Sequence, residues 1–118
     1  MSGALKKTTG LTGLDVCKNP HQQLTILYAK ILRILGSLPA EFAYRKHTEK
    51  LIKERSSIVE QNPDVAAVEE KIGCGQIEEI IMQAKNECTL ATSMVKWKPW
   101  ENLVEEAPKY QWTWPPHK

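Results

Sequence analysis

Apolar residues recur along most of this chain at steps of three and four, the spacing that places them on one face of an α-helix. The first run follows Asn19-Pro20, a helix-start signal, and predicts a helix over about residues 20–37, before Pro39. A second run predicts a helix over about 40–61, ahead of Asn62-Pro63. The inward face of the first helix is formed by Leu24, Leu27, Tyr28, Ile31, Leu35 and Leu38, and that of the second by Tyr44, Thr48, Leu51, Arg55, Ile58 and Val59.

Two more helices follow the same spacing. Pro63 and Asp64 start a short helix of about two turns that stops at Gly73. After the turn "GCG", a long helix is predicted over about 76–97. No segment alternates at period two, so we predict no sheet. The fold class is therefore all-α, a three-helix bundle with a short extra helix, in which we expect Leu27, Ile31, Leu51, Ile58, Ile80 and Ala84 to be buried.

The bundle at residues 20–97 leaves a polar lead-in at 1–19 and a Pro/Trp-rich tail at 98–118. Four prolines and the absence of a sustained period predict that the tail is extended. Exposed aromatic side chains are costly for a monomer and typical of interface anchors. We therefore predict a partner interface formed by Trp97, Trp100, Tyr110, Trp112 and Trp114. The alternative, a tail that folds back onto its own bundle, stays open.

Composition and charge exclude several classes of function. The 118 residues are 42% hydrophobic and 25% charged, as in one ordinary globular domain. The net charge of +2 divides into +6 over residues 1–55 and −4 over 56–118, without the dominant basic face that nucleic acid needs. Lys46, Lys50 and Lys53 share a helix face, but glutamates interleave with them. We therefore predict no nucleic-acid partner. No stretch approaches the roughly 18 apolar residues of a membrane span, so we also predict no direct membrane span.

Residues that could support catalysis or bind a metal form no recognisable set. Cys17 and His21 lie four apart, but Asn19-Pro20 interrupts the helix that would pair them. The odd number of cysteines without a CxxC pair fits a reducing compartment. His21, His47 and His117 have no ligand spacing. We therefore predict no catalytic residue, no cofactor and no metal site.

Two further motifs invite a chemical interpretation. "GCGQ" follows a helix and lacks the Walker lysine, so we interpret it as a helix-to-helix turn. The pairs Glu69-Glu70 and Glu78-Glu79 cannot converge on one bond, because helix neighbours point about 100° apart. We expect these carboxylates on solvated faces, with Glu78 and Glu79 in a first turn where they favour the helix dipole.

Six stretches together resemble one family, in order and over nearly the whole chain: "LKKTTGLTGL", "PHQQLTILYAKIL", "AYRKHTEKL", "NPDV", "GQIEEIIMQAKNE" and "WKPWENLVEEAPKYQWTWP". It is the accessory subunit family called NADH dehydrogenase (ubiquinone) 1 alpha subcomplex subunit 5, of mitochondrial complex I. The resemblance implies a non-catalytic scaffold and assembly subunit, peripheral on the matrix side of the inner membrane. It also implies a place in the peripheral arm near iron–sulfur protein subunit 3. A free-standing helical protein-interaction adaptor is the alternative.

The chain departs from the family pattern at three places. Cys74 stands where the family usually has the first glycine of a Gly-Gly-Gln turn, Gln22-Gln23 replaces a charged pair, and Pro116-His117-Lys118 extends the usual ending. The lead-in "MSGALKKTTGLTGL" lacks the apolar run of a secretory signal and the arginines of a typical transit peptide. We expect this lead-in to be a flexible polar segment.

Overall fold

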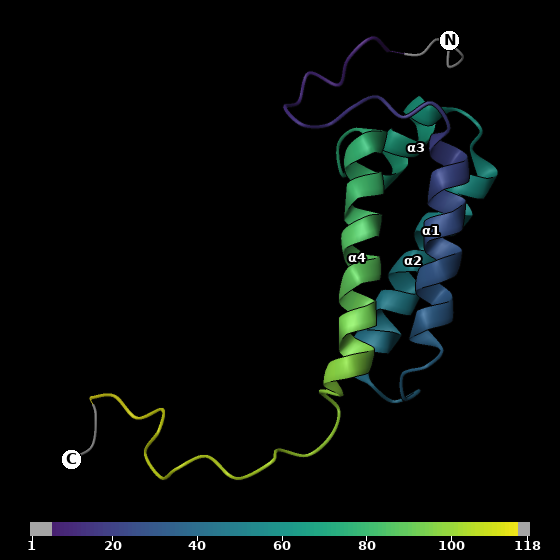
Figure 1. Cartoon of the computed structure of the whole chain (residues 1–118). Coiled ribbons are helices and arrows are strands. Elements are labelled where there is room, and N and C mark those ends of the chain that lie inside the picture. The colour runs from purple at the N-terminus through teal and green to yellow at the C-terminus, as the bar shows by residue number, and fades with distance from the viewer. Residues whose placement is uncertain (1–5, 116–118) are drawn as a thin grey trace.

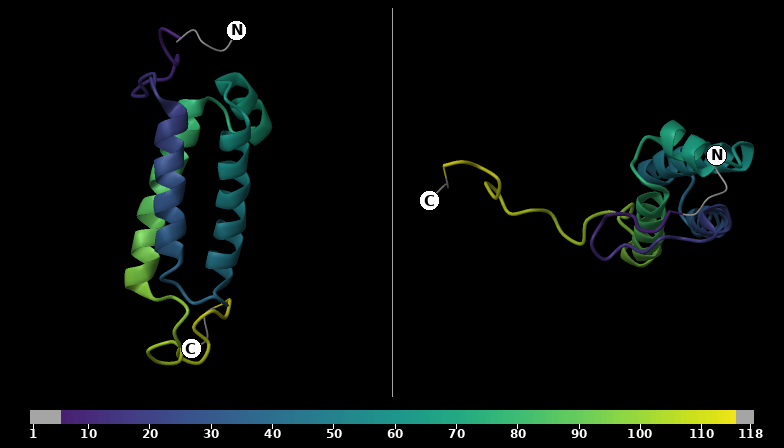
Figure 2. Two further views of the ribbon diagram at one scale, coloured as in Figure 1. Left: turned by 90° about the vertical axis from the view of Figure 1, so that its right-hand side faces the viewer. Right: turned by 90° about the horizontal axis from the view of Figure 1, so that it is seen from above.

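The computed structural model describes residues 6–115, and all regular secondary structure in that range is helical. The helices are α1 (Pro20–Leu35), α2 (Ala43–Gln61), α3 (Val65–Ile72) and α4 (Ile77–Trp97). Helices α1, α2 and α4 run side by side along the bundle, and α3 lies across one end (Figures 1 and 2). The all-α prediction and the order of three long helices and one short one are confirmed.

Local chemistry explains where the helices begin and end. Pro20 occupies the first turn of α1, where its missing N–H is tolerated. Helix α2 begins later than predicted, because Phe42 is extended (φ −64°, ψ 122°) and its N–H donates to the Pro39 carbonyl in a preceding turn. At the start of α3, the Asp64 carboxylate accepts from the Ala66 N–H at 3.2 Å.

The core is centred on α1, which packs against both α2 and α4. Leu24, Tyr28, Ile31 and Leu35 contribute one buried residue for each turn of α1. The facing residues of α4 are Ile77, Ile80, Ile81, Ala84, Cys88 and Ala91. The predicted burial of Ile31, Ile80 and Ala84 is confirmed.

The predicted inward face of α2 is confirmed at Thr48 and Val59 but was wrong at Leu51. Leu51 is 43% exposed, whereas Ile52, which was not assigned to the core, is 3% exposed. Leu27 and Ile58 are only half-buried. Apolar residues occupy two adjacent sides of α2, and neighbours in a helix point about 100° apart. The tertiary structure selects the side that carries Ile52 and Val59.

The turn between α3 and α4 has the predicted helix-to-helix character. Gly73 and Gly75 have φ angles of 72° and 92°, in the region that favours glycine. A Cβ on Gly75 would lie 2.1 Å from a carboxylate oxygen of Glu79. That carboxylate accepts from the Gln76 N–H at 2.7 Å and caps α4. Cys74 lies outside the positive-φ region, so a glycine is not needed at the position where this chain departs from the family pattern that it resembles.

The N-terminal segment differs from the flexible lead-in that we expected. Residues 6–19 lie at the α3 end of the bundle and make defined contacts there (Figure 1). Thr9 is 7% exposed, and its hydroxyl donates to the Leu14 carbonyl at 2.6 Å. The rest of the predicted lead-in, residues 1–5, lies outside the described residues.

Candidate functional site

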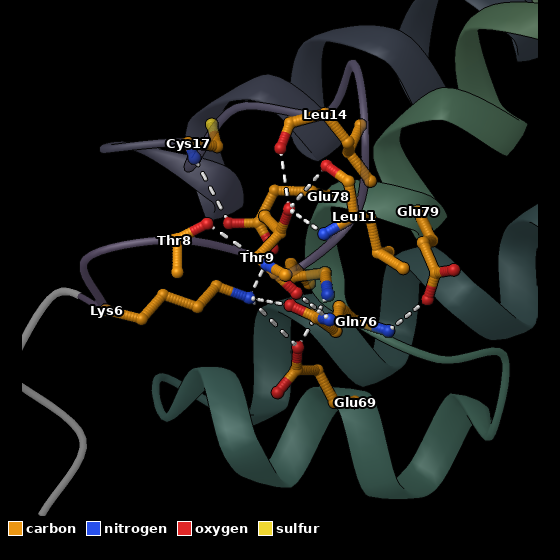
Figure 3. Close-up of polar contacts among 12 residues, drawn as sticks. Lys6, Thr8, Thr9, Leu11, Leu14, Cys17, Glu69, Gln76, Glu78 and Glu79 are labelled. Carbon is orange, nitrogen blue, oxygen red and sulfur yellow. Dashed lines mark hydrogen bonds and ion pairs between the residues drawn. The ribbon is translucent and has the colours of Figure 1, made fainter.

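A polar cluster holds the N-terminal segment against α4, and we name Lys6, Thr9, Cys17, Gln76 and Glu78 the N-terminal clasp (Figure 3). The Lys6 ammonium lies 2.5 Å from Oε1 of Glu78 and donates to Oε1 of Gln76 at 2.7 Å. The Gln76 amide nitrogen donates to the Thr9 carbonyl at 2.7 Å. The Cys17 N–H donates to Oε2 of Glu78 at 3.1 Å. These bonds join segments about 60 to 70 residues apart in the sequence.

Glu78 is the buried charge of this cluster. It is 3% exposed, so the prediction of a solvated face was wrong for this carboxylate. Burial opposes its ionisation, but Lys6 and the Cys17 N–H outweigh burial and hold the pKa of Glu78 below its usual value. Glu78 is therefore a carboxylate that fixes the N-terminal segment. Helix periodicity could not reveal this role, because it depends on residues far away in the chain.

The residues considered for catalysis do not converge. His21 Nε2 lies 2.7 Å from the Asn62 carbonyl oxygen, while the Cys17 thiol contacts the Asn19 side chain at 3.7 Å. Within residues 6–115, no group of three or more His, Cys, Asp or Glu side chains could hold a metal ion. His117 lies outside the described residues. No helix within the same range has the length and apolar content to cross a membrane.

The base of the tail is held by the bundle. Lys98 ends α4 in the left-handed conformation (φ 51°), with its N–H donating to the Met94 carbonyl at 3.1 Å. Two residues later, Trp100 is half-buried and packs edge-on against Phe42, with ring centroids 5.4 Å apart. Trp97, at the end of α4, remains 65% exposed. Contact with Phe42 fixes the point at which the tail leaves the bundle.

Beyond Trp100 the tail runs away from the bundle, and every residue from 101 to 115 is exposed (Figures 1 and 2). Trp112 and Trp114 are 88% and 86% exposed. The Lys109 ammonium lies 5.1 Å from the ring centroid of Tyr110. The predicted interface residues therefore form two groups, one at the end of α4 and one near the end of the tail. The end of the predicted tail, residues 116–118, lies outside the described residues.

The sequence analysis missed an apolar pair between these two groups. Leu103 and Val104 are 80% and 103% exposed. Two adjacent aliphatic residues in a polar segment bounded by prolines are a sequence signal for exposed apolar surface.

The fold and its surfaces define a small helical protein that exposes apolar and aromatic side chains at the end of α4 and along its tail. Residues 13–79, more than half of the chain, match the family described as "ETC complex I subunit conserved region". The chain is similar to NADH dehydrogenase (ubiquinone) 1 alpha subcomplex subunit 5 of Bos taurus, with 57% identity over 98% of this chain and 99% of the relative. The Mus musculus subunit is 54% identical over the same shares. A probable subunit 5 of Caenorhabditis elegans is 52% identical over 93% of this chain and 73% of the relative.

This chain belongs to the family of NADH dehydrogenase (ubiquinone) 1 alpha subcomplex subunit 5. The full-length matches extend beyond the conserved region into the aromatic tail, so the tail is part of the likeness.

Proposed function

We propose that this protein is a non-catalytic accessory subunit of mitochondrial NADH:ubiquinone oxidoreductase, complex I, with a structural and assembly role. The observation that carries this function is the match to subunit 5 over 98% of this chain and 99% of the Bos taurus relative. A match of this extent includes the bundle, the N-terminal segment and the tail. It does not favour a free-standing adaptor.

The proposed contact surface includes Trp97, Trp100, Tyr110, Trp112 and Trp114. The exposure of Trp97, Tyr110, Trp112 and Trp114 supports this assignment, because aromatic residues are enriched among the residues that contribute most binding energy in protein interfaces. Prolines limit the conformations of the tail and so reduce the entropy lost on docking. Trp100 has a second role in this proposal, since its packing on Phe42 sets the starting point of the tail.

The finer location rests on family resemblance. We propose that the subunit binds on the matrix side of the inner membrane, in the peripheral arm of complex I, and that iron–sulfur protein subunit 3 is among its partners. The exposed aliphatic and aromatic residues of the tail provide surface suited to such protein contacts.

Native gel electrophoresis of mitochondria tests the proposed function. In cells that lack the native subunit, the expressed full-length chain should comigrate with the intact complex and restore its amount. A catalytic subunit detected on the same gel provides the size reference. If the chain migrates only at low mass while complex I is intact, it is a free-standing adaptor.

A further inference from the structure

A groove of about 330 Å³ lies between α2 and α4. Tyr28 of α1, Ile52 and Ala84 contribute its buried surface, while Leu51 and Leu90 line it from α2 and α4. Helix α1 packs against both neighbours, so it forms the bottom of the groove. The volume is at the low end for small-molecule pockets, which favours a side chain over a cofactor as occupant.

Long polar side chains connect the two sides of this groove. The Arg55 guanidinium donates to Oε1 of Gln83 at 3.1 Å, and the Tyr44 hydroxyl donates to the Glu87 carboxylate. Arg55 therefore places a positive charge on the α2 side, and Glu87 places a negative charge on the α4 side. A partner that fits has an apolar centre, with an acidic group toward α2 and a basic group toward α4.

The groove lacks a cover on its α2 side within the described residues. Leu51 lines that side with an apolar side chain that is 43% exposed. The floor is already covered by this chain, since Tyr28 is 1% exposed. An exposed apolar side chain in a groove provides surface that a partner can cover.

We propose that this groove receives an amphipathic helix from a neighbouring subunit of complex I, which inserts one large apolar side chain beside Leu51. This inference rests on the proposed function. The residues on both sides follow helical spacing: Leu51 and Arg55 on α2, and Gln83, Glu87 and Leu90 on α4. Side-by-side helices with such ridges form the groove into which another helix packs.

The tail of this chain does not fit as the occupant. It leaves the bundle at the C-terminal end of α4 and runs away from it (Figure 1). Pro99 and Pro108 interrupt it, and a proline inside a helix removes a hydrogen bond and clashes with the preceding turn.

Site-specific crosslinking identifies the occupant directly. A photo-crosslinking amino acid replaces Leu51 in the full chain, expressed in cells that lack the native subunit. The matched control carries it at Ile26 of α1, which is 58% exposed and does not line the groove. Position 51 should link to a helical segment of another complex I subunit, and position 26 should not form that link. The absence of a link from position 51, or a link to a second copy or to residues 98–118 of the same chain, would overturn the proposal.

Charge substitution measures the importance of the groove. Leu51→Glu and Ile26→Glu both alter exposed residues, so both full-length variants should melt like the wild type. In competition with co-expressed wild-type chain, Leu51→Glu should enter complex I at least about thirtyfold less well, the effect of one interface hot spot. Ile26→Glu should compete equally. Equal incorporation of Leu51→Glu contradicts the groove proposal.

Leu51→Ala provides the decisive measurement if Leu51→Glu fails to fold. It removes the apolar contact without adding charge, and its share of complex I should fall by about tenfold in the same competition. An unchanged share would overturn the inference. When the wild type comigrates with complex I and all variants compete equally, only the groove proposal fails; when the wild type itself does not comigrate, the proposed function fails.

Discussion

Replacing Lys6 with Met should loosen the N-terminal segment and lower the stability of the whole chain. Methionine keeps much of the length of lysine but removes the ammonium that lies 2.5 Å from Glu78. Glu78 is 3% exposed and would keep backbone N–H groups, that of Cys17 among them, but no counter-charge. A buried carboxylate that loses its counter-charge is strongly destabilising.

The magnitude follows from the exposure of the two partners. Breaking a fully buried ion pair costs about 3–5 kcal/mol. The Lys6 side chain is 33% exposed, so water already screens the pair, and detachment of the segment would return water to Glu78. We therefore expect a loss of about 1–2 kcal/mol in the free energy of unfolding, which lowers Tm by roughly 3–8 °C for a domain of this size.

Thermal melting and amide hydrogen exchange measure the two consequences separately. The Lys6→Met variant should melt earlier, and the Cys17 N–H should exchange faster because its acceptor is no longer held in place. Lys7→Met is the matched control, since Lys7 is adjacent and exposed. If both variants melt and exchange like the wild type, the N-terminal clasp contributes no stability and the reasoning is refuted.

The same cluster predicts the direction of the pH dependence. The folded-state pKa of Glu78 lies below its unfolded value of about 4.5. Its ionisation therefore adds stability above that value, and this contribution is lost as the pH falls through the folded-state pKa. A Glu78→Gln variant should lack this contribution and show a flatter Tm profile on the acid side. Parallel profiles for the variant and the wild type would contradict the assignment.

The remaining predictions concern the core, the buried Tyr28 hydroxyl, the absence of a catalytic role and the tail. Ile80→Asp places an unpaired charge at a residue with 0% exposure and should cost about 3–5 kcal/mol, so an unchanged Tm would refute the inward face of α4. Tyr28→Phe removes a buried hydroxyl without a partner and should leave stability within about 1 kcal/mol or raise it, whereas a larger loss would reveal a hydrogen bond. His21→Ala should leave NADH oxidation per assembled complex unchanged, and lost turnover with normal assembly would reveal a missed site. Deletion of residues 99–118 should preserve helical circular dichroism and cooperative melting but prevent entry into complex I, since each buried aromatic anchor contributes about 2 kcal/mol or more; normal assembly would exclude the tail as an anchor.

The helices were predictable because their signals are local. Steps of three and four, prolines before the starts and glycines in the turn identified all four elements. The side of α2 that faces the core was less predictable. Leu51 and Ile52 have nearly equal apolar character, and packing against the rest of the bundle distinguishes them. The exposure of Leu51 is the observation that most supports the proposed groove partner.

The contacts of the N-terminal segment depend on distant partners. Lys6 and Gln76 are 70 residues apart, and no period or spacing in a single sequence connects them. In the sequence, Glu78 has the position expected of an acidic residue in the first turn of a helix, and that position does not predict burial. The tail was recognisable from its aromatic residues and prolines, whereas the contacts that we propose for it depend on residues of another chain.

Crosslinking mass spectrometry on intact mitochondria tests the central claim most directly. Lysines border the proposed surfaces, with Lys98 and Lys109 in the tail and Lys50 and Lys53 on α2. Links from these residues to peripheral-arm subunits of complex I, with iron–sulfur protein subunit 3 among them, are the predicted result. Links confined to proteins outside complex I would contradict the assignment of this chain as an accessory subunit.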